Sequence, residues 1–219
     1  MGNTILTDRQ CRALTAVAKN PIVARQFYLT GGTALSEYYL HHRPSEDLDF
    51  FSEKEIDLLW LTTLGKTLKS ALTASTVDIQ QSYNRNLMFF SFSDGILKME
   101  FTYFPFTQIE NPLMKNGVKI DSLIDIAVNK FFTIYQQPAS RHFIDLYCIL
   151  QHTQYSWGKL TDLARAKFDV AIDPVQLGSQ LITAQTIGQL PHVLVPLDDH
   201  AWRRFYLDKA KTLKSVIRV

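Results

Sequence analysis

The first half of the chain alternates apolar and polar residues in short runs, a pattern typical of half-buried strands. These runs predict strands at residues 27–30, 46–52, 75–82, 87–93, 96–104 and 117–120. Apolar residues at helical spacing predict helices at residues 7–19, 33–41 and 55–74 of the same half. Turn-forming residues separate the later strands, at Asn84-Arg85-Asn86 and Ser93-Asp94-Gly95.

After residue 120, the apolar residues recur at helical spacing. It predicts helices at residues 122–136, 139–152, 157–168, 174–187 and 198–216, with prolines between several of them. We therefore expect an α+β protein in two parts. Residues 1–120 would form a core that carries the sheet, and residues 121–219 would form a helical region.

Two carboxylates, Asp47 and Asp49, lie on one of the expected strands. Side chains two residues apart on a strand point to the same face, so both carboxylates share a face while Leu48 and Phe50 point to the core. Carboxylates this close repel each other unless a cation lies between them, and oxygen ligands suit Mg²⁺. The same alternation is also typical of an ordinary half-exposed strand, and the pattern alone leaves both interpretations open.

A glycine pair, Gly31 and Gly32, precedes these carboxylates and is followed by Thr33. Glycines allow backbone N–H groups to approach a phosphate closely, and the helix expected next adds the positive end of its dipole. Neither the GxxxxGK[ST] nor the GxGxxG spacing occurs here. The segment therefore predicts a triphosphate-binding turn that differs from both of these loops.

Three short motifs in residues 31–51 carry a resemblance to a known family. They are Gly-Gly-Thr-x-Leu from Gly31, His-Arg-x-Ser from His42 and Asp-Leu-Asp-Phe-Phe from Asp47. The segment resembles the N-terminal signature of the AbiEii/AbiGii toxins, nucleotidyltransferase-like proteins of bacterial abortive-infection and toxin–antitoxin systems. The resemblance implies a polymerase β-type minimal nucleotidyltransferase core with a mixed sheet, plus a C-terminal helical region that completes the active site.

The resemblance also implies a third metal-binding carboxylate on a neighbouring strand, and Glu100 is the candidate. Alternation on the strand at 96–104 puts Lys98, Glu100 and Thr102 on one face. Aspartate is common at this position in the family. The alternative is that Glu100 forms a solvated cross-strand pair with a nearby cation.

Lys130 lies within the apolar stripe of the helix expected at residues 122–136. A lysine on a buried face is unfavourable unless a negative group meets it, and a nucleoside triphosphate would be such a group. The segment Val-Asn-Lys-Phe-Phe resembles a family motif implicated in activity. Alternatively, the Lys130 side chain extends from the edge of the stripe to solvent.

Asp145 belongs to a segment, Arg-His-Phe-Ile-Asp-Leu-Tyr, that resembles the family's final motif. The resemblance implies an essential aspartate near the lysine. The alternative is a helical pair with Arg141, which would contribute only about 0.2–0.5 kcal/mol to stability. Both interpretations can hold, because Arg141 could orient the aspartate.

Composition narrows the class of protein. With 46% hydrophobic and 12% aromatic residues the chain can bury a full core. No run of about eighteen apolar residues predicts a membrane span. Cys11 and Cys148 are expected to be buried free thiols, and the N-terminal residues lack the pattern of a secretion signal. We therefore expect a cytoplasmic protein that does not bind membranes.

The net charge of +2 is nearly balanced, but the C-terminal residues are strongly basic. The cations of this run are Arg203, Arg204, Lys209, Lys211, Lys214 and Arg218. A basic helix of this kind either contacts phosphate backbones or is an ordinary solvated face.

The residues and the resemblance together predict a Mg²⁺-dependent nucleotidyltransferase. The expected metal ligands, for two Mg²⁺ ions, are Asp47, Asp49 and Glu100. The expected contacts to the nucleoside triphosphate are Gly31, Gly32, Thr33 and Lys130, and Asp145 would orient Lys130 or the acceptor.

The resemblance implies a toxin with a cognate antitoxin encoded next to it, and tRNA as the acceptor. Three alternatives remain open: a small-molecule acceptor, as in aminoglycoside-type enzymes, a protein acceptor, and a nucleotide-binding module without turnover.

Overall fold

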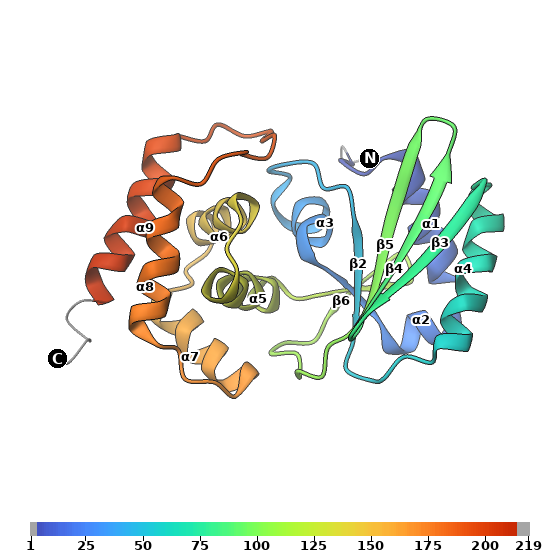
Figure 1. Cartoon of the computed structure of the whole chain (residues 1–219), viewed down its shortest axis with the longest axis horizontal. Helices are drawn as coiled ribbons and strands as arrows, with labels where there is room; N and C mark the ends of the chain where they lie inside the picture. Colours follow the sequence, from blue (N-terminus) through green and yellow to red (C-terminus); the bar gives the residue numbers. More distant parts are fainter. Residues whose placement is uncertain (1–3, 214–219) are drawn as a thin grey trace. The chain divides into compact units, whose positions relative to one another are not determined.

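The chain divides into two compact units, Met1–Ser122 and Leu123–Val219. We call them the sheet unit and the helical unit. The structure is a computed structural model, and it describes residues 4–213. Figure 1 shows the helices and strands of both units.

The described part of the sheet unit contains one mixed sheet of seven strands in the order β3-β4-β5-β2-β1-β7-β6. The strands are β1 (Tyr28–Thr30), β2 (Leu48–Ser52), β3 (Thr76–Ser82), β4 (Arg85–Phe92), β5 (Gly95–Tyr103), β6 (Leu113–Lys115) and β7 (Val118–Ile120). Strands β2 and β5 pair in parallel, as do β1 and β7, and the other pairs are antiparallel. The mixed sheet with helices confirms the predicted α+β class.

The sheet unit has helices on both sides of its sheet (Figure 1). They are α1 (Asp8–Ala18), α2 (Pro21–Gln26), α3 (Gly31–Leu35), the π-helix η1 (Ser36–Leu40) and α4 (Leu58–Leu72). Thr7 and Gln10 form a capping box that fixes the start of α1. The helix predicted at residues 33–41 instead begins at Gly31 and changes to π geometry after Leu35.

Aromatic residues build the core between the sheet and α4. Leu48 and Phe50 are fully buried, as the alternation predicts. The Phe50 ring stacks on Phe101 of β5 with 5.1 Å between ring centroids, and Phe27 stacks on Trp60 of α4 at 5.5 Å. Because this face of β2 and β5 is filled, their polar side chains lie on the opposite face.

One local prediction was wrong, and one strand was not predicted. The turn expected at Asn84-Arg85-Asn86 lies one residue earlier, at Tyr83 and Asn84, because Arg85 already pairs with Ser82 across the hairpin. The Asn86 side chain also donates a hydrogen bond to the Phe101 carbonyl, which anchors it within β4. Strand β6 was missed because its three residues are all exposed and show no alternation.

The helical unit consists of helices that follow the predicted boundaries closely. They are α5 (Leu123–Gln136), α6 (Ser140–His152), α7 (Trp157–Phe168), α8 (Pro174–Ile182), the 3₁₀ helix η2 (Thr183–Gln185) and α9 (Asp199–Leu213). The buried Tyr206 hydroxyl of α9 donates a 2.7 Å hydrogen bond to the Phe143 carbonyl of α6. Residues 214–216 of the last predicted helix lie outside the described residues.

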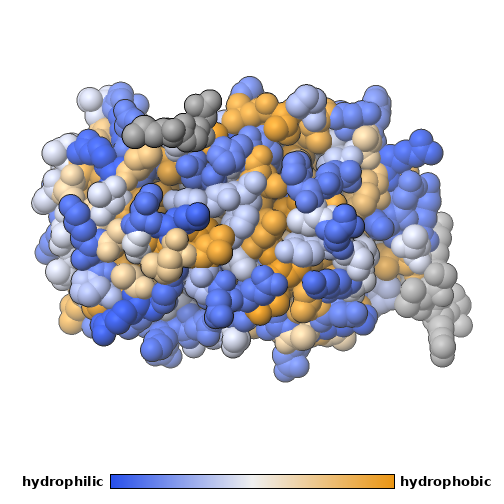
Figure 2. All heavy atoms as spheres, turned by 180° about the vertical axis from the view of Figure 1, so that it is seen from behind, coloured by the Kyte–Doolittle hydropathy of each residue, from blue (hydrophilic) through white to orange (hydrophobic). Residues whose placement is uncertain are grey.

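On the face seen in Figure 2, hydrophilic side chains are interspersed with hydrophobic ones. Scattered apolar side chains are normal on a protein surface. Across residues 4–213, none of the helices combines the length and the apolar character that crossing a bilayer requires.

Candidate active site

Three carboxylates gather on one face of the paired strands β2 and β5. The parallel register puts Asp49 directly opposite Glu100, and Leu48 opposite Met99. Asp47 comes one residue before β2 and is half-buried, like Asp49. We call Asp47, Asp49 and Glu100 the acidic face, since their side chains lie opposite the aromatic core.

The glycine turn lies directly against this acidic face. Gly31 has a φ of +72°, and a Cβ atom at this position would collide with the Asp49 carboxylate. A Cβ atom on Gly32 would lie 2.7 Å from the Arg43 guanidinium and 2.7 Å from the Ser45 hydroxyl. Both positions therefore require glycine, and the His-Arg-x-Ser segment packs under the turn.

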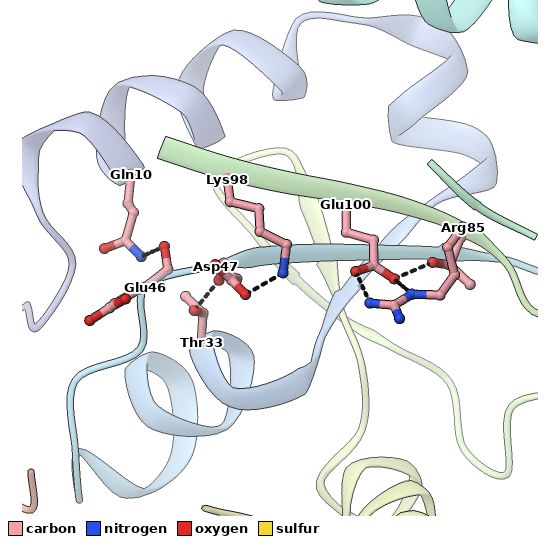
Figure 3. A network of polar contacts seen from close by, with 8 residues as sticks. Gln10, Thr33, Glu46, Asp47, Arg85, Lys98 and Glu100 are labelled. Carbon is pink, nitrogen blue, oxygen red and sulfur yellow. Dashed lines mark hydrogen bonds and ion pairs between the residues drawn. The ribbon is translucent and has the colours of Figure 1, made fainter. Parts of the chain in front are cut away.

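Two buried polar side chains hold the segment that leads to Asp47 (Figure 3). The Thr33 hydroxyl donates a hydrogen bond to the Asp47 backbone carbonyl. The Gln10 amide donates to the carbonyls of Ser45 and Glu46, at 2.7 and 3.2 Å. Thr33 and Gln10 are each only 1% exposed, so both act as fixed supports for the loop.

Sequence reasoning missed Gln10. Its only visible signal was the Thr-x-x-Gln capping pattern, which explains the bonds of its side-chain oxygen to Thr7 but says nothing about the bonds of its amide nitrogen. The Thr33 hydroxyl was expected to meet the triphosphate, whereas in the structure it faces the Asp47 carbonyl.

Two cations contact the acidic face (Figure 3). The Lys98 ammonium of β5 lies 2.6 Å from the Asp47 carboxylate. The Arg85 guanidinium of β4 binds Glu100 through two hydrogen bonds of 2.7 Å, and the Thr102 hydroxyl donates a third of 2.7 Å. Glu100 thus has the cross-strand cation that the sequence left open, although its carboxylate is buried rather than solvated.

The contacts of Glu100 shift the pKa values of both partners. Burial alone would raise the pKa of Glu100, but the hydrogen bonds from Arg85 and Thr102 outweigh it and hold this pKa below its ordinary value. The hydrogen bond to Glu100 raises the pKa of Arg85, and the charges of Asp49 and Asp47 add to that rise. The negative field of the acidic face therefore extends to β4.

The donor set of the acidic face suits a hard divalent cation. All three side chains offer carboxylate oxygens, the ligands that Mg²⁺ prefers. Within the part of the chain that the structure describes, no group of three or more His, Cys, Asp or Glu side chains is arranged as a ready metal site. In the structure, Lys98 and Arg85 supply positive charge to Asp47 and Glu100.

The other predicted pair, Lys130 and Asp145, lies in the helical unit. The Lys130 ammonium on α5 is 2.7 Å from the Asp145 carboxylate on α6, and their side chains are 9% and 0% exposed. Asp145 therefore supplies a negative partner within the protein for Lys130, and the side chain does not extend to solvent. A second buried pair, which the sequence did not reveal, joins Lys167 of α7 to Asp125 of α5 at 2.6 Å.

The basic residues of α9 are mostly engaged in local contacts. Arg203 pairs with Asp199 at 3.0 Å and donates to the carbonyls of Ala184 and Ile187. Lys211 pairs with Asp208 at 3.0 Å, and Arg204 approaches the same aspartate at 3.9 Å. Lys214 and Arg218, also part of the basic run, lie outside the described residues.

Comparison with known families identifies the chain. The family model described as "Nucleotidyl transferase AbiEii toxin, Type IV TA system" matches residues 12–209. The chain belongs to the AbiEii family. It is therefore a nucleotidyltransferase of the AbiEii toxin type, from a toxin–antitoxin system, as the motifs around Gly31 and Asp47 indicate.

The individual relatives of this AbiEii protein have low sequence identity to it. The uncharacterized protein aq_aa25 of Aquifex aeolicus is 29% identical over 150 residues, which cover 67% of this chain and 68% of that protein. The crystal structure of JHP933 from Helicobacter pylori is 22% identical and covers 95% of this chain and 90% of its own, with a TM-score of 0.57.

A further crystal structure, of a "putative nucleotidyltransferase" from H. pylori, gives a TM-score of 0.58 at 22% identity. It covers 98% of this chain and 100% of its own. Such low identity shows a shared fold only. The predicted nucleotidyltransferase fold, with its mixed sheet and added helices, is confirmed.

Proposed function

We propose that this AbiEii protein is a Mg²⁺-dependent enzyme that transfers NMP from an NTP to tRNA, with two Mg²⁺ ions held by Asp47, Asp49 and Glu100. The observation that carries the proposal is the β2–β5 register, which pairs Asp49 with Glu100 beside Asp47. Metal ions bound there would lower the pKa of the acceptor hydroxyl and neutralise charge on the α-phosphate. Glu100 can contribute only if its bonds to Arg85 are replaced or shared.

The chain's own groups would position the reactants. In the transfer, the acceptor oxygen bonds to the α-phosphorus, the bond from the α-phosphorus to the pyrophosphate oxygen breaks, and the acceptor loses its proton. The backbone N–H groups of Gly31, Gly32 and Thr33 would contact the triphosphate. The close fit of Gly31 against Asp49 supports this role, because it brings unobstructed backbone to the acidic face.

Lys130 and Asp145 are proposed to serve the same reaction. The family motifs around them support this role, and the 2.7 Å contact between the two side chains is consistent with their acting together. In this proposal Lys130 adds positive charge toward the nucleotide, and Asp145 holds its ammonium in place. If Lys130 and Asp145 proved to have no role in the reaction, the proposed metal site would still stand.

The acceptor is proposed to be tRNA, and the protein is accordingly placed in the cytoplasm with a cognate antitoxin as its partner. The resemblance to toxins that modify tRNA supports the acceptor, as does the basic run of α9. The local ion pairs of α9 limit how much free positive charge that helix offers. A direct test of the acceptor is therefore the most informative experiment.

The test follows label from each α-labelled NTP into total tRNA, total protein and a small-molecule fraction. We expect label in tRNA. Label confined to protein or to a small molecule would contradict the tRNA acceptor but leave nucleotidyl transfer standing.

A variant with fewer cations on α9 tests whether this helix binds tRNA. Replacing Arg204, Lys209 and Lys211 with glutamine should weaken tRNA labelling and flatten its salt dependence, because fewer counterions are released. Arg203 is left intact, since its bonds to Ala184 and Ile187 support the fold. Unchanged labelling would show that tRNA binds elsewhere on the protein.

A further inference from the structure

The contact between Lys98 and Asp47 occupies one of the two carboxylate oxygens through which Asp47 could bind a metal ion. The Lys98 ammonium lies 2.6 Å from Asp47 Oδ2, with side chains 27% and 39% exposed. Lys98 stands two residues before Glu100 on β5, so both point to the acidic face. Figure 3 shows the ammonium directed at the Asp47 carboxylate.

Binding of a metal ion and this ammonium to the same oxygen is electrostatically unfavourable. Mg²⁺ binds carboxylate oxygens at about 2.0–2.1 Å, which would bring two cations into near contact at Oδ2. Like charges this close repel strongly, particularly where solvent is partly excluded. A metal ion that binds Asp47 at Oδ2, or through both oxygens, therefore displaces the ammonium.

Lys98 is the cation better suited to move. Among the described residues, its ammonium forms a single ion pair, with a carboxylate that is partly exposed, and its flexible stem can carry the ammonium elsewhere. Arg85 instead makes two bonds to Glu100, whose side chain is only 6% exposed. Two-point binding to a buried carboxylate is the stronger of the two arrangements.

We propose that Lys98 is an exchangeable counter-cation that a divalent metal ion displaces from Asp47. This inference rests on the proposed metal site. In the metal-free protein, Lys98 neutralises Asp47 and relieves repulsion on the acidic face. Its presence lowers the affinity for metal, and the ammonium released by metal binding becomes free to meet the phosphates of the incoming nucleotide.

The test is Mn²⁺ binding without nucleotide, measured by electron paramagnetic resonance on the full chain. Lys98→Met should bind Mn²⁺ about fivefold tighter than wild type, because no ion pair has to be broken first. Lys98→Arg keeps the charge and should bind within about twofold of wild type. Lys66→Met, at an exposed lysine of α4, removes the same charge from another part of the sheet unit and should also match wild type.

Two further variants distinguish a failure of the Lys98 exchange from a failure of the proposed metal site. Lys98→Gln repeats the test if the methionine variant is poorly folded by circular dichroism. Asp49→Asn identifies the site, because it should abolish the Mn²⁺ binding of wild type. Equal or weaker Mn²⁺ binding by Lys98→Met, with binding still lost in Asp49→Asn, would overturn the exchange and leave the metal site standing. Binding that is absent, or unaffected by Asp49→Asn, would overturn both.

Discussion

Two ion pairs, one in each unit, differ in how far they are exposed to solvent. On the acidic face, the Lys98–Asp47 pair is 2.6 Å long and its side chains are 27% and 39% exposed. In the helical unit, the Lys130–Asp145 pair is 2.7 Å long, yet its side chains are only 9% and 0% exposed. The two distances are nearly equal, so solvent exposure is what distinguishes the pairs.

Exposure decides whether such a pair can exchange partners. An exposed ion pair contributes about 0–1 kcal/mol, since water competes for both groups. Removing one partner of a buried pair costs about 3–5 kcal/mol, because an uncompensated charge remains in the interior. On the acidic face, a bound metal ion can therefore replace Lys98 as the partner of Asp47. The buried pair of Lys130 and Asp145 instead links α5 to α6 permanently.

The largest expected effect is the loss of a buried charge partner. Asp145→Asn should lower the free energy of unfolding by about 3–5 kcal/mol, because Lys130 keeps its charge without its carboxylate. Urea unfolding monitored by circular dichroism measures this loss. A loss below about 1 kcal/mol would show that the pair behaves like a surface contact.

The second buried pair provides a matched comparison. Replacing both partners with apolar residues should restore most of the stability in each case, as Lys130→Met with Asp145→Leu or as Lys167→Met with Asp125→Leu. Only the Lys130 double variant should lose toxicity in cells. Equal loss of toxicity in both would remove the functional distinction between the two pairs.

A smaller effect is expected at Glu100. Glu100→Gln should lower the free energy of unfolding at neutral pH by about 2 kcal/mol, since it weakens the charged hydrogen bonds to Arg85. The folded-state pKa of Glu100 is lowered, so its contribution is present above its ordinary pKa of 4.5. That contribution is lost as the pH falls through the lower, folded value.

Urea unfolding of wild type and Glu100→Gln across the acid range checks this prediction. The difference between them should shrink as the pH falls below 4.5. A difference that stays constant with pH would mean that the charge of Glu100 does not carry the effect.

The smallest effect is expected at Lys98. Lys98→Met should change the free energy of unfolding of the metal-free protein by less than about 1 kcal/mol, because the pair is partly exposed. Thermal unfolding in excess chelator measures it. A loss as large as that of Asp145→Asn would contradict the contrast between the two units.

Local periodicity allowed much of the fold and part of the site to be predicted. The alternation around Leu48 and Phe50 fixed which side of β2 faces the core, and therefore where Asp49 points. The apolar stripe of α5 indicated that Lys130 needs a negative partner, and in the structure Asp145 is such a partner.

What the sequence could not predict are contacts that depend on how distant segments align. The pairing of Lys98 with Asp47 follows from the β2–β5 register, which no local pattern encodes. The bonds from Gln10 to Ser45 and Glu46 likewise join a helix to a loop far along the chain. Strand β6 was missed because an exposed edge strand lacks the alternation that burial imposes.

The central claim is that Asp47 and Asp49 serve metal-dependent nucleotidyl transfer. Its most direct test is transfer of label from α-labelled NTP into acceptor by purified wild type and Asp49→Asn, with and without Mg²⁺. The matched control is Asp78→Asn, an exposed carboxylate on β3. We expect transfer by wild type and Asp78→Asn only with Mg²⁺, and a loss of at least about a thousandfold in Asp49→Asn. Transfer by Asp49→Asn at the wild-type rate, or transfer that persists in excess chelator, would contradict the account.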